Sequence, residues 1–119
     1  MKQASNTWKI DTDEQHFEQQ VLQESHRRPV LVDVWADWCS PCLIIAPVLD
    51  KVISEFDGGI LLAKLDADDN MRIAGRYHVR GFPTLMLFRN GEDIARFSGA
   101  KPVHVVREFI EEHTGLSAG

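Results

Sequence analysis

Cys39 and Cys42 are the only cysteines in the chain, and two residues separate them. On a helix this spacing places both side chains on one face. The thiolate of one cysteine can then attack a partner disulfide, and the second thiol can release the reduced partner and close a ring. The loop between the two cysteines is too short for a cross-link to remove much entropy from the unfolded chain. The spacing therefore favours a chemical role over a structural one.

Metal binding and inert packing are the alternatives for this pair. A zinc site takes four ligands, often as two such pairs, and the five histidines of the chain show no ligand spacing. Buried thiols can also be inert, because cysteine packs as a small hydrophobe. Asp66, Asp68 and Asp69 do not complete a calcium-loop pattern, and we expect a solvated acidic loop there. A lone C-x-x-C is a moderate signal that indicates redox chemistry more strongly within a βαβ pattern.

The flanking sequence predicts that the pair lies where a strand ends and a helix begins. Residues 30–36 are apolar on both faces and rich in β-branched side chains, as in a central buried strand. Apolar residues then recur at helical spacing and stop at Gly58. In the first turn of such a helix, the Cys39 sulfur meets unpaired N–H groups and the positive end of the helix dipole, which favour the thiolate. Pro41 is tolerated there and stiffens the loop.

Asp33 interrupts the apolar run, where its carboxylate should be almost fully buried. Burying a carboxylate is costly unless it is paired or protonated. One interpretation is a proton acceptor for the Cys42 thiol, with a pKa raised by desolvation. Another is a structural carboxylate paired with Lys64 of a neighbouring strand. The two interpretations are compatible, and the nearby thiols favour the first.

The remaining elements complete a βαβαβαββα order, provided that a short strand lies near residues 8–10. The capping-box pattern Thr12-x-x-Gln15 predicts a first helix that runs to about Ser25. Helix-linked strands require a parallel portion of the sheet. Further strands are expected at residues 60–65, 84–89 and 92–97, and further helices at 71–77 and after residue 102.

Turn signals add an antiparallel edge to this sheet. Asn90-Gly91 predicts a hairpin, Gly99 predicts a bulge or a close backbone approach, and Pro102 suits the first turn of the last helix. Pro83 opens a strand, but only about 5% of X–Pro bonds are cis, so the pattern alone predicts no cis bond. The predicted fold class is α/β, a mixed sheet with helices on both faces.

The composition is that of an ordinary globular chain of 119 residues, the size of one domain. The 13 basic and 18 acidic residues give a net charge of −5, which argues against nucleic acid as the main partner. No apolar stretch approaches the roughly 20 residues that span a bilayer. Residues 1–20 also lack the apolar region of a signal peptide. We therefore expect a cytoplasmic, single-domain protein without membrane contact, ordered from about residue 8 to 113, with loose ends at 1–7 and 115–119.

Taken together, these motifs resemble the thioredoxin family, from about Trp8 to His113. The combination is specific, although each motif alone is not. The resemblance implies the thioredoxin fold, a central mixed five-stranded sheet flanked by four helices. It also implies a protein-disulfide reductase that binds no cofactor and is recharged from NADPH by thioredoxin reductase. The matching segments and residues are Trp35-Ala36-Asp37-Trp38-Cys39-Ser40-Pro41-Cys42, Pro47, Lys64, Gly81-Phe82-Pro83-Thr84, Asn90-Gly91 and Gly99.

The resemblance also implies catalytic roles for four residues. Cys39 is similar to the attacking cysteine of the family, and Cys42 is similar to the resolving cysteine. Asp33 is similar to the buried acid, and Lys64 to its lysine neighbour. The implied catalytic set is thus Cys39, Cys42, Asp33 and Lys64, with no metal.

Other matching residues are implied to surround the substrate. Trp38 is similar to the indole beside the site, and Trp35 to the tryptophan packed behind it. Pro83 is similar to the cis-proline that faces the cysteines, and Phe82 would offer its backbone to an extended substrate strand. Gly99 would keep the docking surface flat. The expected substrate-binding residues are Trp38, Ser40, Pro41, Phe82, Pro83 and Gly99.

Departures from the family pattern keep other functions open. Ser40 replaces a glycine, and Leu43 replaces a lysine or arginine. Leu43 motivates one alternative, a redox-linked chaperone or scaffold module, such as the N-terminal domain of a longer protein, that binds clients through Trp38, Leu43 and Phe82. The simpler interpretation, which we prefer, is that Leu43 packs on its own helix. A thiol oxidase or isomerase is less favoured, because those relatives usually carry a histidine between the cysteines. The expected partners are thioredoxin reductase and disulfide-containing proteins, and the expected state is a monomer.

Overall fold

The structure is a computed structural model that describes residues 8–119, so the expectation for residues 1–7 lies outside the described residues. Its five strands are β1 (Lys9–Thr12), β2 (Val30–Trp35), β3 (Leu61–Asp66), β4 (Thr84–Arg89) and β5 (Glu92–Ser98). They form one sheet in the order β1-β3-β2-β4-β5. The first three strands of that order are parallel, and β4 and β5 add antiparallel pairing. The predicted mixed sheet is confirmed.

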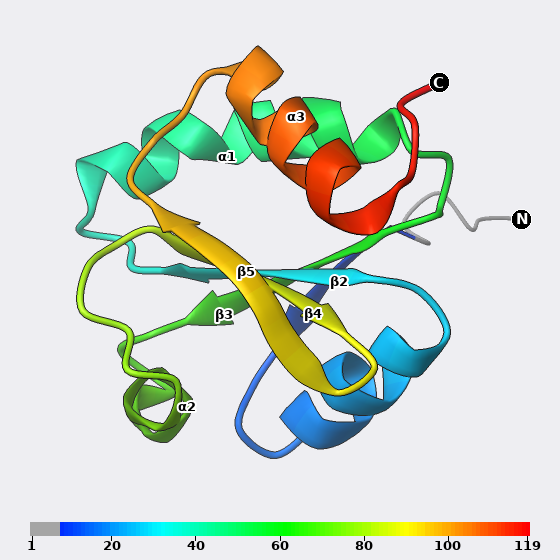
Figure 1. Ribbon diagram of the computed structural model, residues 1–119. Coiled ribbons are helices and arrows are strands. Elements are labelled where there is room, and N and C mark those ends of the chain that lie inside the picture. Colours follow the sequence, from blue (N-terminus) through cyan, green and yellow to red (C-terminus); the bar gives the residue numbers. More distant parts are fainter. Residues whose placement is uncertain (1–7) are drawn as a thin grey trace, which may run out of the picture.

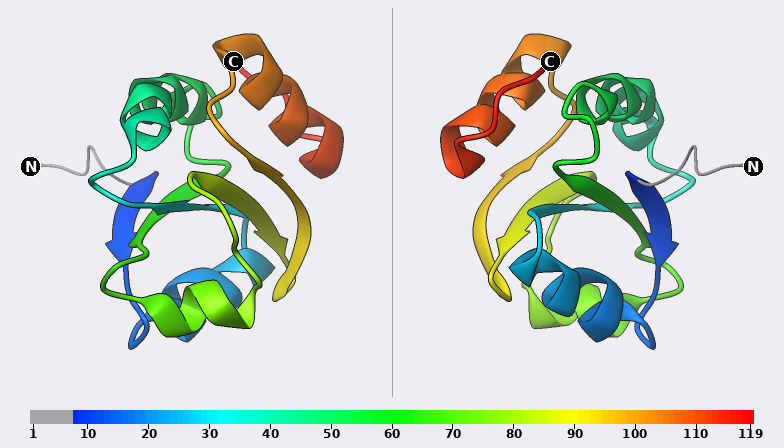
Figure 2. Two further views of the ribbon diagram at one scale, coloured as in Figure 1. Left: turned by 90° about the vertical axis from the view of Figure 1, so that its left-hand side faces the viewer. Right: turned by 90° about the vertical axis from the view of Figure 1, so that its right-hand side faces the viewer.

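Helices cover both faces of this sheet (Figure 1). On one face lie α1 (Ser40–Ser54) and α3 (Val103–Thr114). On the other lie η1 (Glu18–Gln23), η2 (Glu24–His26) and α2 (Met71–Arg76), and the side views show both layers (Figure 2). Within residues 8–119, no helix is long and apolar enough to cross a membrane.

The central strand β2 supplies side chains to both apolar cores. Val32 and Val34 pack in the core that contains η1 and α2 residues, whereas Leu31 packs in the core under α1 and α3. Since side chains alternate along a strand, Asp33 and Trp35 point to the same side as Leu31. Asp33 therefore lies on the face of the sheet that α1 covers.

Residues 12–26 differ from the prediction. Thr12 is the last residue of β1, and its hydroxyl is buried without a hydrogen-bond partner, so the capping-box prediction is wrong. Asp13 instead accepts the hydrogen bond from the His16 N–H, at 2.9 Å. The chain continues as a π-helix, η1, and a 3₁₀-helix, η2, rather than as an α-helix. Its end is tied to the distant hairpin, because the Gly91 N–H donates to Ser25 Oγ at 2.8 Å.

Of the turn predictions after β4, the Asn90-Gly91 hairpin is confirmed, whereas Gly99 and Pro102 differ from what was expected. Asn90 and Gly91 have φ of 54° and 84°, as the predicted hairpin turn requires. The bulge expected at Gly99 is absent there, and the register shift lies within the β4–β5 pairing instead. Gly99 has a φ of 88° with open space around a Cβ, so backbone conformation and not close approach favours glycine. Pro102 precedes the first turn of α3 as its N-cap residue.

The segment after α3 turns back onto α1. Gly115 ends α3 with a φ of 77°. The Gly119 N–H donates to the Glu55 carbonyl at 2.7 Å, and Leu116 packs against the core between α1 and α3. These contacts hold residues 115–119 against the rest of the fold in the structure.

Candidate active site

Cys39 and Cys42 form a disulfide bond at the amino end of α1, with Cα atoms 5.3 Å apart. Cys39 is the N-cap residue with an extended backbone, and Pro41 lies in the first turn. The predicted placement, between a central strand and a helix start, is confirmed. The two sulfurs are therefore placed to be oxidised and reduced together as one disulfide.

The start of α1 directs the Cys42 backbone amide at the Cys39 sulfur. The Cys42 N–H donates to Cys39 Sγ at 3.2 Å. The same N–H also donates to the Cys39 carbonyl at 3.1 Å, and the dipole of α1 is positive at this end. Both effects stabilise a negative charge on Cys39 Sγ once the disulfide is reduced. Both cysteines are nearly covered, so a partner must fit closely to reach them.

Trp38 and Phe82 lie together beside the disulfide. The Trp38 side chain is exposed, and its ring meets Phe82 edge to face with centroids 5.7 Å apart. Its indole N–H donates to Asp68 Oδ2 at 2.9 Å. Phe82 also packs against the cysteines. Asp68 therefore positions Trp38, a role that the sequence reasoning missed when it assigned Asp68 only to a solvated loop.

The Phe82–Pro83 peptide bond is cis, as the resemblance implied. The Gly99 N–H donates to the Pro83 carbonyl at 2.9 Å, so the ends of β4 and β5 meet there. Ser40 and Pro41 are exposed on the first turn of α1. The structure thus places Pro83 and Gly99 together, and Ser40 and Pro41 directly beside the disulfide.

Asp33 is fully buried, and Lys64 Nζ lies 3.4 Å from its Oδ2. Neither carboxylate oxygen has a hydrogen bond, so the contact with Lys64 is an ion pair only. Burial raises the pKa of the Asp33 carboxyl above its ordinary value, and the Lys64 ammonium opposes this rise. The predicted burial and the predicted pairing with Lys64 are confirmed. A carboxyl in this state can accept and return a proton nearer neutral pH.

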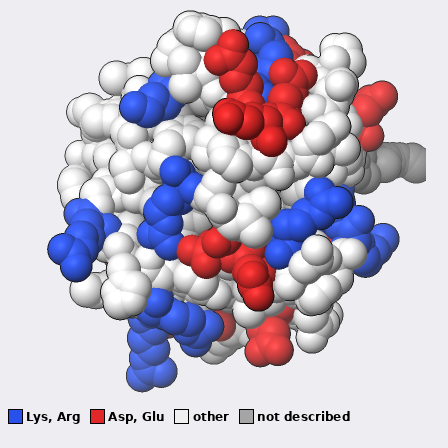
Figure 3. Space-filling model, in the orientation of Figure 1, with Lys and Arg blue, Asp and Glu red and all other residues white. Residues whose placement is uncertain are grey.

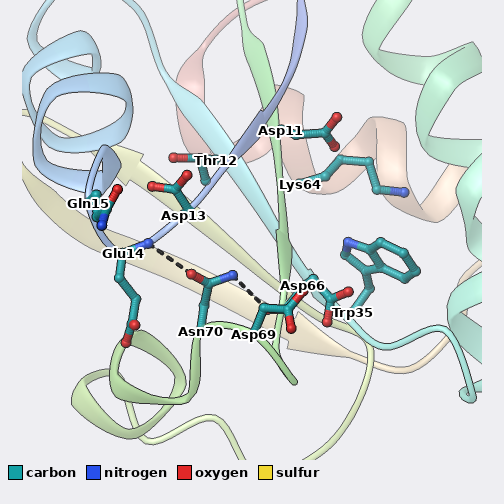
Figure 4. Close-up of a pocket in the computed structure, with 10 residues that line it drawn as sticks. All are labelled: Asp11, Thr12, Asp13, Glu14, Gln15, Trp35, Lys64, Asp66, Asp69 and Asn70. Atoms are coloured by element: carbon teal, nitrogen blue, oxygen red, sulfur yellow. Dashed lines mark hydrogen bonds between the residues drawn. The ribbon is translucent and has the colours of Figure 1, made fainter.

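Lys64 also faces a cleft of about 550 Å³ at the carboxyl ends of β1 and β3 (Figure 4). Lys64 Nζ lies 5.2 Å from the centroid of the Trp35 ring, which also lines the cleft. Trp35 in turn packs against the cysteines. Carboxylates line much of the remaining wall, but the described residues hold no group of three or more ligands for a metal ion. The cleft therefore connects Lys64 to the disulfide through Trp35.

A disulfide between cysteines two residues apart, at the start of a helix that follows a central strand, defines a thiol–disulfide oxidoreductase. The family model "Thioredoxin" matches residues 8–112. The chain is 33% identical to "Thioredoxin" of Chlorobaculum thiosulfatiphilum, over 89% of this chain and 96% of the relative. It is 39% identical to "Thioredoxin 1" of Nostoc sp., over 82% and 89%, and 44% identical to "Thioredoxin" of Haemophilus influenzae, over 71% and 79%. The chain belongs to the thioredoxin family.

Proposed function

We propose that this thiol–disulfide oxidoreductase works as a protein-disulfide reductase, with Cys39 as the attacking and Cys42 as the resolving cysteine. The observation that carries the proposal is the Cys39–Cys42 disulfide at the amino end of α1, where the Cys42 N–H donates to Cys39 Sγ. A thiolate at Cys39 is favoured by that hydrogen bond and by the helix dipole.

The reaction is a two-electron exchange in two steps. The Cys39 thiolate attacks one sulfur of the partner disulfide, a mixed disulfide forms, and the other partner sulfur leaves as a thiolate. Cys42 then loses its proton and attacks Cys39 Sγ, and the second partner sulfur leaves. Both partner sulfurs end as thiols after taking up protons, and the Cys39–Cys42 pair ends oxidised.

Asp33 is proposed to accept the Cys42 proton, with Lys64 as the group that limits the rise of the Asp33 pKa. In support, Asp33 lies on the α1 side of the sheet, is fully buried, and has a raised pKa. Lys64 limits that rise through its ion pair at 3.4 Å. Asp33 can therefore bind and release a proton beneath the helix that carries Cys42, with a pKa that depends on Lys64.

Partner segments are proposed to bind across the surface around the disulfide. Phe82 would offer backbone groups to an extended strand of the partner. The other proposed contacts are Trp38, Ser40, Pro41, Pro83 and Gly99. As a thioredoxin-family member, the protein is proposed to draw electrons from NADPH through thioredoxin reductase, and to act as a cytoplasmic monomer of one domain.

Trapping the mixed disulfide tests the two cysteine roles. A Cys42→Ser variant should hold a disulfide-bearing partner covalently through Cys39, as intact mass will show, and Cys39→Ser should hold none. The opposite pattern would reverse the roles. The reduction potential tests the direction: a value near −270 mV, that of thioredoxins themselves, supports a reductase, and about −120 to −180 mV points to an oxidase or isomerase.

A further inference from the structure

Exposed apolar side chains gather beside the disulfide. Among the described residues, five large apolar side chains are exposed, and three of them, Trp38, Leu43 and Ile44, lie within five residues of Cys39. Leu43 is 57% exposed and Ile44 is 63% exposed. These exposures agree with the preferred interpretation that Leu43 is an exposed apolar residue on its own helix, and they leave its side chain free to contact a partner. We call Leu43 and Ile44 the α1 ridge.

The α1 ridge leans toward the disulfide. The Leu43 N–H donates to the Cys39 carbonyl at 3.3 Å, so Leu43 lies one helical turn after Cys39. At about 1.5 Å of rise per residue, it lies about 6 Å farther along the helix axis. Side chains on a helix tilt toward its amino end. Leu43 therefore leans over the turn that carries Cys39, and Ile44 continues the exposed apolar surface around the helix.

The α1 ridge lies in a chain segment without charged residues. No charged residue occurs from Trp38 to Leu49, and Asp37 and Asp50 bound this segment. Figure 3 shows both signs of charge over β5 and α3, whereas the upper left, over the start of α1, is mostly white apart from a blue patch of Lys or Arg. A charged side chain of a partner would lose water here and find no opposite charge within this segment, but an apolar side chain gains by burial.

We propose that the α1 ridge selects one class of partner: extended polypeptide segments with a large apolar residue about two positions from the reacting cysteine. Every partner must approach this surface, because its disulfide has to reach Cys39, so the ridge is continuous with the surface where exchange occurs. An extended chain advances about 3.3 Å per residue, so two residues span the distance from Cys39 to Leu43. The inference rests on the proposed reductase function and names its substrate class.

Two disulfide-linked peptide dimers test this selection. One has leucine two residues before and after its single cysteine, and the other has serine at both places. The pre-reduced protein is mixed with each peptide, and tryptophan fluorescence follows the rate. We expect the leucine-to-serine rate ratio of Leu43→Gln/Ile44→Gln to be about fivefold below that of the parent, equivalent to about 1 kcal/mol.

Two controls separate the ridge from general effects. Leu43→Met/Ile44→Met keeps an apolar ridge and should keep the parent ratio. Ile94→Gln removes the exposed isoleucine of β5, which is 44% exposed, and should also keep it. An unchanged ratio in the glutamine double variant, or an equal fall in Ile94→Gln, would overturn the inference while leaving the reductase function intact. Failure of the pre-reduced parent protein to reduce either peptide dimer would overturn the proposed function, and the inference with it.

Discussion

Asp33→Asn should stabilise the oxidised protein at neutral pH. The Asp33 carboxylate is fully buried, accepts no hydrogen bond, and has only the Lys64 ammonium, 3.4 Å away, as a favourable contact. Asparagine has nearly the same shape and carries no charge, so the change removes the charge without opening a cavity. The oxidised protein has no titrating thiol, so the comparison isolates Asp33.

The magnitude follows from opposing contributions. An ion pair at 3.4 Å contributes about 5 kcal/mol at an effective dielectric constant of about 20. Desolvation opposes it by several kcal/mol for each ion. The raised pKa of Asp33 shows that desolvation outweighs the lysine. Asparagine removes the desolvation cost of the Asp33 carboxylate together with its attraction to Lys64, so the net effect is the difference of the two, and we expect a gain of about 2 kcal/mol. The Lys64 ammonium does not become a buried, unpaired charge in the variant, because its side chain is 14% exposed and lines an acidic cleft.

The pH dependence of the stability difference tests the role of Asp33 more directly than its size at one pH. The pKa of Asp33 is higher in the folded protein than the unfolded value of 3.8, so protonation of Asp33 stabilises the folded state. This stabilisation is fully present below pH 3.8 and is lost as the pH rises through the folded pKa. Urea unfolding of parent and variant, from neutral pH toward 3.8, should therefore show a stability difference that shrinks with falling pH.

Asp93→Asn is the matched control, because Asp93 pairs with Arg96 at 2.6 Å but its side chain is 35% exposed. Its removal should lower stability by no more than about 1 kcal/mol. If Asp33→Asn destabilises the protein at neutral pH, or stabilises it equally at every pH, the reasoning about the buried carboxylate is refuted.

Three further predictions concern groups around the site and the tail. Glu55→Gln should lower the melting temperature at neutral pH, because Arg107, 2.7 Å away, lowers the pKa of Glu55 to about 2. The stability that Glu55 contributes is therefore present above pH 4.5 and is lost as the pH falls toward 2. A difference in melting temperature that does not depend on pH would contradict this. Asp68→Ala should free the Trp38 indole and lower stability by about 0.5–1.5 kcal/mol, seen as lower fluorescence anisotropy and an earlier urea midpoint; unchanged anisotropy would count against the contact. Removal of residues 116–119 should lower the free energy of unfolding by about 1–2 kcal/mol through loss of the Leu116 contacts, and an unaltered urea midpoint would show that the tail adds nothing.

Local sequence determined much of the site. The start of α1 at Cys39 follows from a C-x-x-C with proline in its first turn, because N-cap and first-turn preferences are set by neighbouring residues. The Asn90-Gly91 hairpin follows from the positive φ that its turn type requires. The burial of Asp33 follows from the apolar residues on both sides of it, since a strand apolar on both faces lies inside a sheet.

Only the tertiary structure decided how distant segments act on these local patterns. Asp68 meets Trp38 because the loops after two adjacent parallel strands lie at the same edge of the sheet, which no local pattern records. The segment before β2 became η1 and η2, with its end tied to Gly91, a partner 66 residues away from Ser25. Leu43 stayed exposed because α1 turns its other face to the sheet. A local pattern specifies which conformations a segment favours, whereas packing between segments far apart in the chain determines which is adopted and which side chains remain at the surface.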